Sequence, residues 1–118
     1  MELEKKNIPV IGTKIVARKD TEEIGHAYLY LIHNDLHDEP YGLMEDIFVE
    51  KEHRGKGIGT KLVHEVVAQA RAHKCYKLLA QSRYEREKVH GLYKKFGFQD
   101  HGKNFRMNLI ESKVDQRD

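Results

Sequence analysis

The sequence has little cysteine, no long apolar run and almost no net charge. Its single thiol, Cys75, cannot form an intramolecular disulfide, which favours a reducing compartment. No stretch approaches the roughly 20 consecutive apolar residues of a membrane-spanning helix, and residues 1–7 lack the apolar segment of a signal peptide. A net charge of +2 does not argue for nucleic acid as a partner. These absences predict a cytoplasmic protein that binds neither membranes nor nucleic acid.

The length and composition of the chain fit one folded domain. Apolar residues make up 39% of the chain and charged residues 34%, a balance that fits a globular protein. At 118 residues the chain is long enough for one core, with little room for a second. We expect a single domain over residues 1–118, with the polar ends 1–7 and 111–118 loose.

Apolar patterning predicts a series of strands and two helices. Runs rich in β-branched and aromatic residues, separated by polar turns, indicate strands. The expected strands span residues 8–18, 24–33, 41–50, 76–80, 98–100 and 104–110. Apolar residues at helical spacing predict helices over residues 60–73 and 84–96. Thr60 is the expected cap of the first helix and Gly97 the stop of the second.

Two of these strands carry a specific expectation about burial. In residues 24–33 both faces are apolar, which predicts that this strand is buried on both sides. In residues 104–110, Phe105, Met107 and Leu109 alternate with polar residues. We therefore expect this strand to bury one face and to pair with residues 98–100 as a hairpin.

Between the strand at residues 41–50 and the helix that follows lies a loop with three alternate glycines, Arg54-Gly55-Lys56-Gly57-Ile58-Gly59-Thr60. Such a loop can turn tightly and aim backbone N–H groups and the positive end of a helix dipole at an anion. The spacing fits neither a P-loop nor the dinucleotide fingerprint. The alternative is a tight connection with no ligand. The order strand, loop, helix, strand also predicts a right-handed parallel crossover.

Two motifs in this order resemble the GNAT superfamily of acetyl-CoA-dependent N-acetyltransferases. Arg54, Gly57 and Gly59 fill its Gln/Arg-x-x-Gly-x-Gly/Ala loop, and residues 92–98 resemble its Leu/Phe-Tyr-x-x-x-Gly-Phe motif. The resemblance implies a single-domain α/β (α+β) fold with a mixed, mostly antiparallel twisted sheet. Acetyl-CoA would lie in a wedge within its β-α-β unit. The helices that commonly follow the first strand of such folds are expected to be missing, because residues 8–32 show the pattern of consecutive strands.

The resemblance also implies roles for individual residues. The enzyme would move the acetyl group of acetyl-CoA to a primary amine, with no metal. Backbone groups of Ile47, Phe48 and Val49 would pair with the pantetheine arm, and the Val49 N–H would bind the oxyanion. The pyrophosphate would be held by the loop residues Arg54, Gly55, Lys56, Gly57, Ile58, Gly59 and Thr60. Tyr93 would be the general acid for the CoA thiolate, although its helical spacing alone favours a core tyrosine.

The sequence leaves two assignments undecided, the catalytic base and one contact with the cofactor. Glu45 and Asp46 are adjacent on a strand, so at most one would ordinarily be buried. Either acid could take the ammonium proton, with Glu45 slightly favoured, or merely bind positive charge. Where the superfamily often has an Asn that contacts the cofactor, this chain has Arg86, which could reach a CoA phosphate instead.

The polar loop of residues 33–40 contains two histidines and three acids but no spaced ligand pattern, so we expect a solvated loop rather than a metal site. Cys75 is expected to pack, because no Cys/His arrangement accompanies it.

The acceptor amine is the least defined part. Without the usual helices, the acceptor site would either be open to a protein or peptide amine or be completed by a second subunit, and exposed strand edges predict a homodimer. Residues 44–49, the glycine loop and residues 75–79 resemble the glucosamine-6-phosphate N-acetyltransferases within the superfamily. An amino-sugar acceptor is therefore one alternative, and a module that binds acetyl-CoA without chemistry is another.

Overall fold

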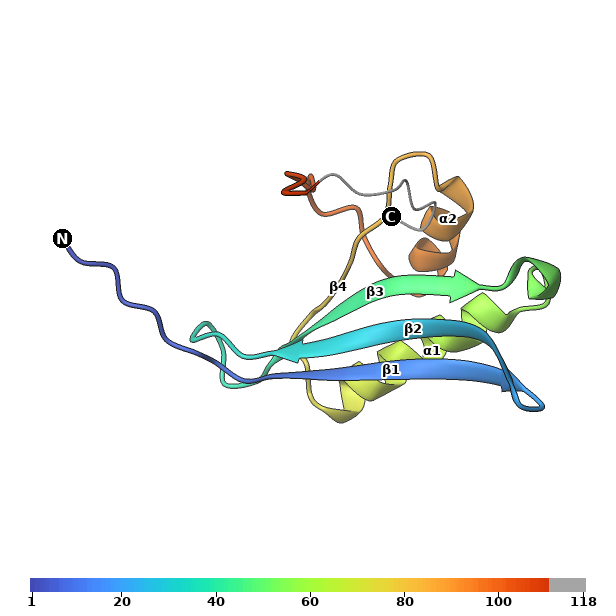
Figure 1. Ribbon diagram of the computed structural model, residues 1–118, viewed down its shortest axis with the longest axis horizontal. Coiled ribbons are helices and arrows are strands. Elements are labelled where there is room, and N and C mark those ends of the chain that lie inside the picture. The colour runs from blue at the N-terminus through green and yellow to red at the C-terminus, as the bar shows by residue number, and fades with distance from the viewer. Residues whose placement is uncertain (111–118) are drawn as a thin grey trace.

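The structure is a computed structural model that describes residues 1–110 and contains one four-stranded sheet in the order β1-β2-β3-β4 (Figure 1). The elements are β1 (Val10–Lys19), β2 (Glu22–Ile32), β3 (Tyr41–Val49), the 3-10 helix η1 (Lys51–His53), α1 (Ile58–Ala72), β4 (Leu78–Ala80) and α2 (Glu87–Lys95). β1, β2 and β3 pair antiparallel, whereas β3 and β4 pair parallel. This confirms the predicted mixed, mostly antiparallel sheet and the parallel crossover through α1.

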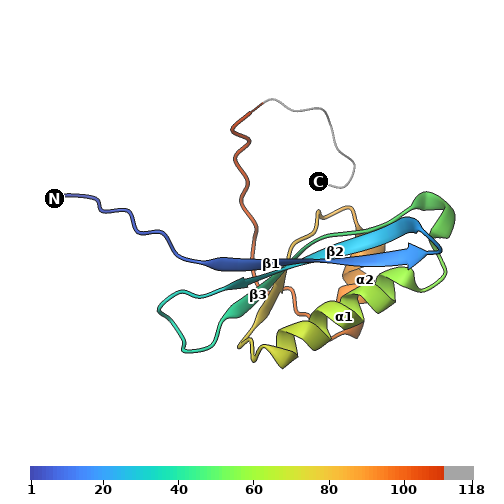
Figure 2. The same ribbon diagram turned by 60° about the horizontal axis from the view of Figure 1, so that its bottom comes forward.

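The core lies between the sheet and α1. The buried face of α1 carries Leu62, Val63, Val66 and Ala70, the spacing that predicted the helix. It packs on the face of β2 that holds Ala27, Leu29 and Leu31. Gly25 belongs to this same face, because a Cβ there would lie 3.4 Å from Leu62 Cδ1 and 3.5 Å from Ile58 Cγ2. In Figure 2 both helices lie on one side of strands β1 to β3.

The opposite face of the sheet is buried at Ile24 and His26 of β2 but only half-buried at Tyr28 and Tyr30, so the prediction of burial on both sides of the second strand is confirmed in part. We call it the open face and define it by His26, Tyr28 and Tyr30 of β2 and Glu45 and Phe48 of β3. Tyr28 and Tyr30 are half-buried, and their rings stack with centroids 6.3 Å apart. Aromatic side chains tolerate this position because each presents an apolar ring and a polar tip.

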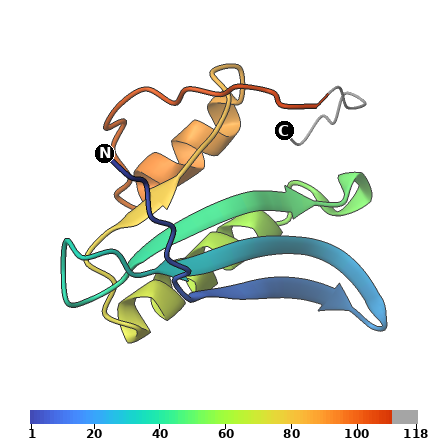
Figure 3. The ribbon, with the colours of Figure 1, turned by 60° about the vertical axis from the view of Figure 1, so that its left-hand side comes forward.

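β3 and β4 separate soon after they meet. They pair only at Gly42 with Leu78, Leu43 with Leu79 and Met44 with Ala80. β3 then continues to Val49, while the chain after β4 leads away toward α2 (Figure 3). The predicted wedge therefore opens beside the second half of β3.

Two predicted helix starts need correction. α1 begins at Ile58 with Gly57 as its N-cap, so Thr60 is in the first turn and does not cap the helix. α2 begins only at Glu87, because the backbone of Arg86 (φ −91°, ψ 62°) is not yet helical. Its C-terminal stop is confirmed, since Gly97, the residue after the C-cap Phe96, adopts a left-handed φ of 94°.

The predicted C-terminal hairpin is also wrong within the described residues. No strand follows β4 in residues 81–110, and the side chains expected to be buried are exposed, with Phe105 at 92% and Leu109 at 85%. An isolated two-stranded hairpin is marginal in water unless it packs on other elements. The predicted tail of residues 111–118 lies outside the described residues. Neither helix of residues 1–110 is both long and apolar enough to cross a bilayer.

Candidate active site

The glycine loop adopts the geometry that its sequence requires. Gly55 and Gly57 have φ angles of 78° and 83°, in the left-handed region that favours glycine. Gly57 leads directly into α1, whose first intrahelical bond runs from the Lys61 N–H to the Gly57 carbonyl at 3.1 Å. The N–H groups of Ile58, Gly59 and Thr60 precede that bond, so they have no acceptor within the helix. Together with the helix dipole, they form a site suited to an anion.

Two basic side chains belong to this loop, and one of them is held in place. The Nε of Arg54 donates a hydrogen bond to the Val49 carbonyl at 2.8 Å. Its guanidinium carbon also lies 5.6 Å from the centroid of the Phe48 ring, within cation–π range. Arg54 thus ties the end of β3 to the loop, whereas Lys56 is exposed at the rim. The first turn of α1 carries no acidic residue that would repel an anion.

A bulge in β3 lies where the wedge opens. The pairing of β2 with β3 shifts between His26 and Tyr28, and Asp46 adopts a left-handed φ of 47°. Such an extra residue bends a strand and re-aims its side chains. Glu45 lies opposite Tyr28, which puts it on the open face, and Asp46 bonds to His26 from that face as well. The bulge therefore brings both acids to one face, against the alternation expected from the sequence, and neither of them is buried.

His26 contacts one of the candidate acids, and sequence reasoning did not name it. Its Nε2 lies 2.9 Å from Asp46 Oδ2, and its Nδ1 lies 3.7 Å from Glu23 Oε2. The pKa of Glu23 is lowered, mainly by its hydrogen bond with Lys14 and then by the charges of Lys14, His26 and Arg18. A lone histidine in an apolar strand carries no motif, and its partner is 20 residues away in sequence. The sequence signal was too weak to find it.

Tyr93 lies on α2 and packs against the core cluster together with Leu92 and Phe96. Burial raises the pKa of the Tyr93 phenol, and the positive charge of Arg86 works against that shift. A raised pKa keeps the phenol protonated, as a general acid requires. Arg86, which the sequence also named for the cofactor site, therefore lies close enough to Tyr93 to act on it electrostatically. A Cβ on Gly59 would lie 3.9 Å from Leu92 Cδ2, which links α2 to the glycine loop.

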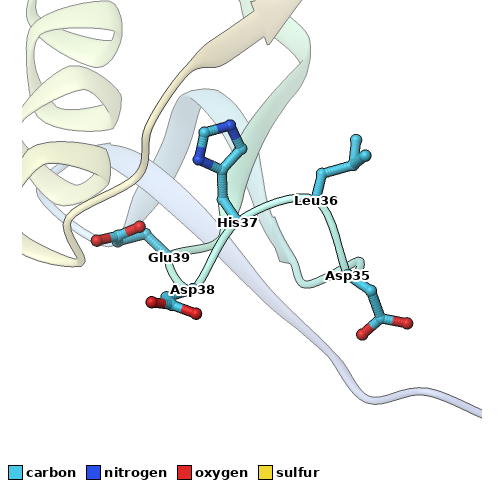
Figure 4. A pocket seen from close by; sticks show the side chains of 5 residues that line it. All are labelled: Asp35, Leu36, His37, Asp38 and Glu39. Atoms are coloured by element: carbon cyan, nitrogen blue, oxygen red, sulfur yellow. The ribbon is translucent and has the colours of Figure 1, made fainter.

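The acidic loop between β2 and β3 is a separate feature. It forms a shallow pocket lined by residues 35–39, in which the carboxylates of Asp35, Asp38 and Glu39 point in different directions (Figure 4). The His37 ring stacks on Tyr76 with centroids 3.8 Å apart. Residues 1–110 contain no group of three or more His, Cys, Asp or Glu side chains placed to hold a metal ion.

Comparison with known proteins agrees with this geometry. Residues 5–98 match the Acetyltransferase (GNAT) family. The chain is 34% identical over 68 residues to glucosamine 6-phosphate N-acetyltransferase of Trypanosoma brucei brucei, covering 58% of this chain and 44% of that one. It is 32% identical over 84 residues to aminoglycoside N(6')-acetyltransferase type 1 of Stenotrophomonas maltophilia, covering 69% and 55%. A solved acetyltransferase structure from Trypanosoma brucei gives a TM-score of 0.73 at 26% identity, covering 85% and 69%.

The chain therefore belongs to the Acetyltransferase (GNAT) family, because that match spans most of its length. It also spans only about half the length of the two relatives named above. The family membership confirms the resemblance inferred from the glycine loop and from the motif around Tyr93.

Proposed function

We propose that this protein transfers the acetyl group of acetyl-CoA to a primary amine. The observation that carries the proposal is the coincidence of three features at one place. The left-handed residues Gly55 and Gly57 lead into the start of α1. Beside that loop, β3 and β4 separate. A bulge at Asp46 turns carboxylates toward the open face. Family membership supports the same reading.

In this proposal the chain's own residues bind and orient acetyl-CoA. The first-turn amides of Ile58, Gly59 and Thr60 hold the pyrophosphate, and Lys56 adds charge at the rim. The second half of β3, from Ile47 to Val49, offers backbone groups to the pantetheine arm as an added strand would. Acetyl-CoA supplies an acetyl group already activated as a thioester, so the protein needs chiefly to orient the reactants and move protons.

The proton transfers can be assigned to side chains at the wedge. A carboxylate at Glu45 or Asp46 takes one proton from the acceptor ammonium, because only a neutral amine attacks the thioester. The amine nitrogen then forms a bond to the acetyl carbon while the Val49 N–H stabilises the oxyanion. The carbon–sulfur bond breaks and Tyr93 donates its phenol proton to the leaving thiolate. The second amine proton is lost as the amide forms and restores Tyr93, leaving one net proton for the solvent.

The relatives suggest which amines to test first. One relative is named for glucosamine 6-phosphate and the other for aminoglycosides, and both are amino sugars. The open face of this chain carries the exposed carboxylate of Glu45 and half-buried aromatic rings, which can bind an ammonium by charge and by cation–π contact. We therefore propose a cationic amine as the acceptor, with amino sugars ahead of lysine side chains.

The test is a thiol-release assay with purified protein and acetyl-CoA. Glucosamine 6-phosphate, kanamycin and a lysine-containing peptide are offered in turn, and free CoA thiol is followed with a disulfide reagent. Thiol release that requires both the amine and the protein, with the acetylated amine detected by mass spectrometry, is the expected result. Binding of acetyl-CoA without release for any amine would instead mean a module that holds acetyl-CoA without chemistry.

We also propose that the protein is a homodimer in the cytoplasm. The outer edge of β1 has no strand beside it among residues 1–110, and exposed edges favour pairing. The exposed apolar side chains of Phe105, Met107 and Leu109 add a surface that a second copy could cover. Light scattering that reports 13.8 kDa, the mass of one chain, would contradict the dimer.

A further inference from the structure

His26 differs from every other polar side chain in the described part of the molecule. It is the one buried polar residue among residues 1–110, with 6% of its surface exposed. The rings of Tyr28 and Phe48 flank it, with centroids 5.4 Å and 5.6 Å from the imidazole. Buried polar groups need hydrogen-bond partners, and His26 has one at the bulge of β3.

The contact between His26 and Asp46 has a defined direction. An ionised carboxylate only accepts hydrogen bonds, so the 2.9 Å contact is a donation from the Nε2–H of His26 to Oδ2 of Asp46. The His26 side chain is 8% exposed, whereas that of Asp46 is 32% exposed. The histidine therefore lies inside and the carboxylate lies at the surface, on the face where the wedge opens.

We propose that His26 positions Asp46 as the base that deprotonates the acceptor ammonium. The proposal rests on the acetyl transfer proposed above and adds a residue to it. In the step, an N–H bond of the ammonium breaks and the proton passes to the Asp46 carboxylate, which later releases it to water. His26 does not touch the amine; its donated hydrogen bond fixes the orientation of the carboxylate.

This arrangement selects Asp46 over its neighbour. Glu45 has an exposed side chain that makes no hydrogen bond or ion pair with a described residue. A carboxylate without a partner must be ordered before it can act, whereas one already held by a buried donor avoids that loss of conformational freedom. On the other side of the imidazole, Glu23 lies within ion-pair distance of Nδ1 and is itself held by Lys14 at 3.2 Å. Contacts at both ring nitrogens thus hold the imidazole of His26 in place.

The experiment compares two substitutions that differ in reach. In His26→Gln the side-chain amide can place an N–H where Nε2 lies, while in His26→Asn the amide is too short to do so. Steady-state thiol release is measured with whichever amine of the panel above wild type turns over fastest. We expect His26→Gln to keep a kcat near wild type and His26→Asn to lose about tenfold or more, with the KM for acetyl-CoA unchanged in both.

A second comparison separates positioning from packing. His26→Phe keeps an aromatic ring between Tyr28 and Phe48 but removes the donor, and we expect it to lose kcat as His26→Asn does. Combining His26→Asn with Asp46→Asn should lower kcat no further than Asp46→Asn alone, because both changes remove the same function. The control is His33→Phe, at an exposed histidine at the end of β2, and it should leave kcat unchanged.

The outcomes are distinct. Equal kcat values for His26→Gln and His26→Asn, or full activity of His26→Phe, would overturn the role of His26 while leaving acetyl transfer in place. Additive losses in the double variant would also overturn it. A wild-type protein that releases no thiol with any amine would instead remove the proposed function, and the role of His26 with it.

Discussion

A single methyl group at Gly57 tests the glycine loop sharply. Gly57 is the N-cap of α1 and has a φ of 83°, in the left-handed region. A Cβ added there would meet no heavy atom within 4 Å, so Gly57→Ala creates no clash. The cost is then that of the backbone alone, about 1–2 kcal/mol for a residue with a Cβ held in the left-handed region.

Gly59→Ala is the matched control, two residues along the same loop. Its φ is not left-handed, and its added Cβ would lie 3.9 Å from Leu92 Cδ2 and Val49 Cγ2, which is ordinary contact. Alanine is favoured over glycine within a helix by up to about 1 kcal/mol. We therefore expect Gly59→Ala to be neutral or slightly stabilising, although the two substitutions add the same methyl group.

Urea unfolding distinguishes the two variants. With a common slope, the free energy of unfolding of Gly57→Ala should lie about 1–2 kcal/mol below wild type, and that of Gly59→Ala at or above it. Titration with acetyl-CoA should also show weaker binding to Gly57→Ala, because relaxing the turn moves the first-turn amides of α1. Equal stability of Gly57→Ala and wild type would refute the left-handed turn.

Further predictions concern the core and its titratable groups. Tyr93→Phe should keep acetyl-CoA affinity and lose most thiol release; unchanged turnover would remove Tyr93 as the acid. Because burial raises the pKa of Tyr93, the folded protein keeps that proton longer than the unfolded chain, whose phenols titrate near pH 10. The free energy of unfolding should thus fall as the pH rises from about 10 through the higher pKa of folded Tyr93, and it should fall less in Tyr93→Phe. If wild type and Tyr93→Phe lost the same stability over this alkaline range, that would argue against the raised pKa. Burial likewise raises the pKa of the Cys75 thiol, so at neutral pH iodoacetamide should alkylate it more slowly in the native protein than in urea, and equal rates would count against it. Gly25→Ala would put a Cβ 2.9 Å from the Phe48 carbonyl oxygen, a clash expected to cost about 1–3 kcal/mol, and an unchanged thermal midpoint would contradict it.

The centre of the fold could be predicted from local sequence because its signals are local. The apolar spacing of Leu62, Val63 and Val66 defines the buried face of α1 whatever else the chain does. Gly57 and Gly97 mark the two left-handed positions that start α1 and end α2, where side chains are disfavoured. The path from β3 through the glycine loop and α1 to β4 follows from such features.

The errors concern features that depend on distant contacts. The bulge at Asp46 arises from the register of β3 against β2, which no alternation in residues 41–50 reveals. His26 becomes a candidate positioning residue only because that bulge brings Asp46 next to it. The alternation of Phe105, Met107 and Leu109 is typical of a strand, but a strand forms only where another strand pairs with it. Local sequence pattern was thus enough to single out the glycine loop and Tyr93. The arrangement of Glu45 and Asp46 could be seen only in the folded sheet.

The measurement that most directly tests the acetyl-CoA site is a thermal melt of the purified protein with and without acetyl-CoA. A ligand present at a hundred times its dissociation constant adds about 2.7 kcal/mol to the free energy of unfolding. We expect a rise of several degrees in the thermal midpoint with acetyl-CoA, and a smaller rise in Gly57→Ala. No shift at millimolar acetyl-CoA would mean that the glycine loop is a plain connection between β3 and α1, and the proposed acetyl transfer would be wrong.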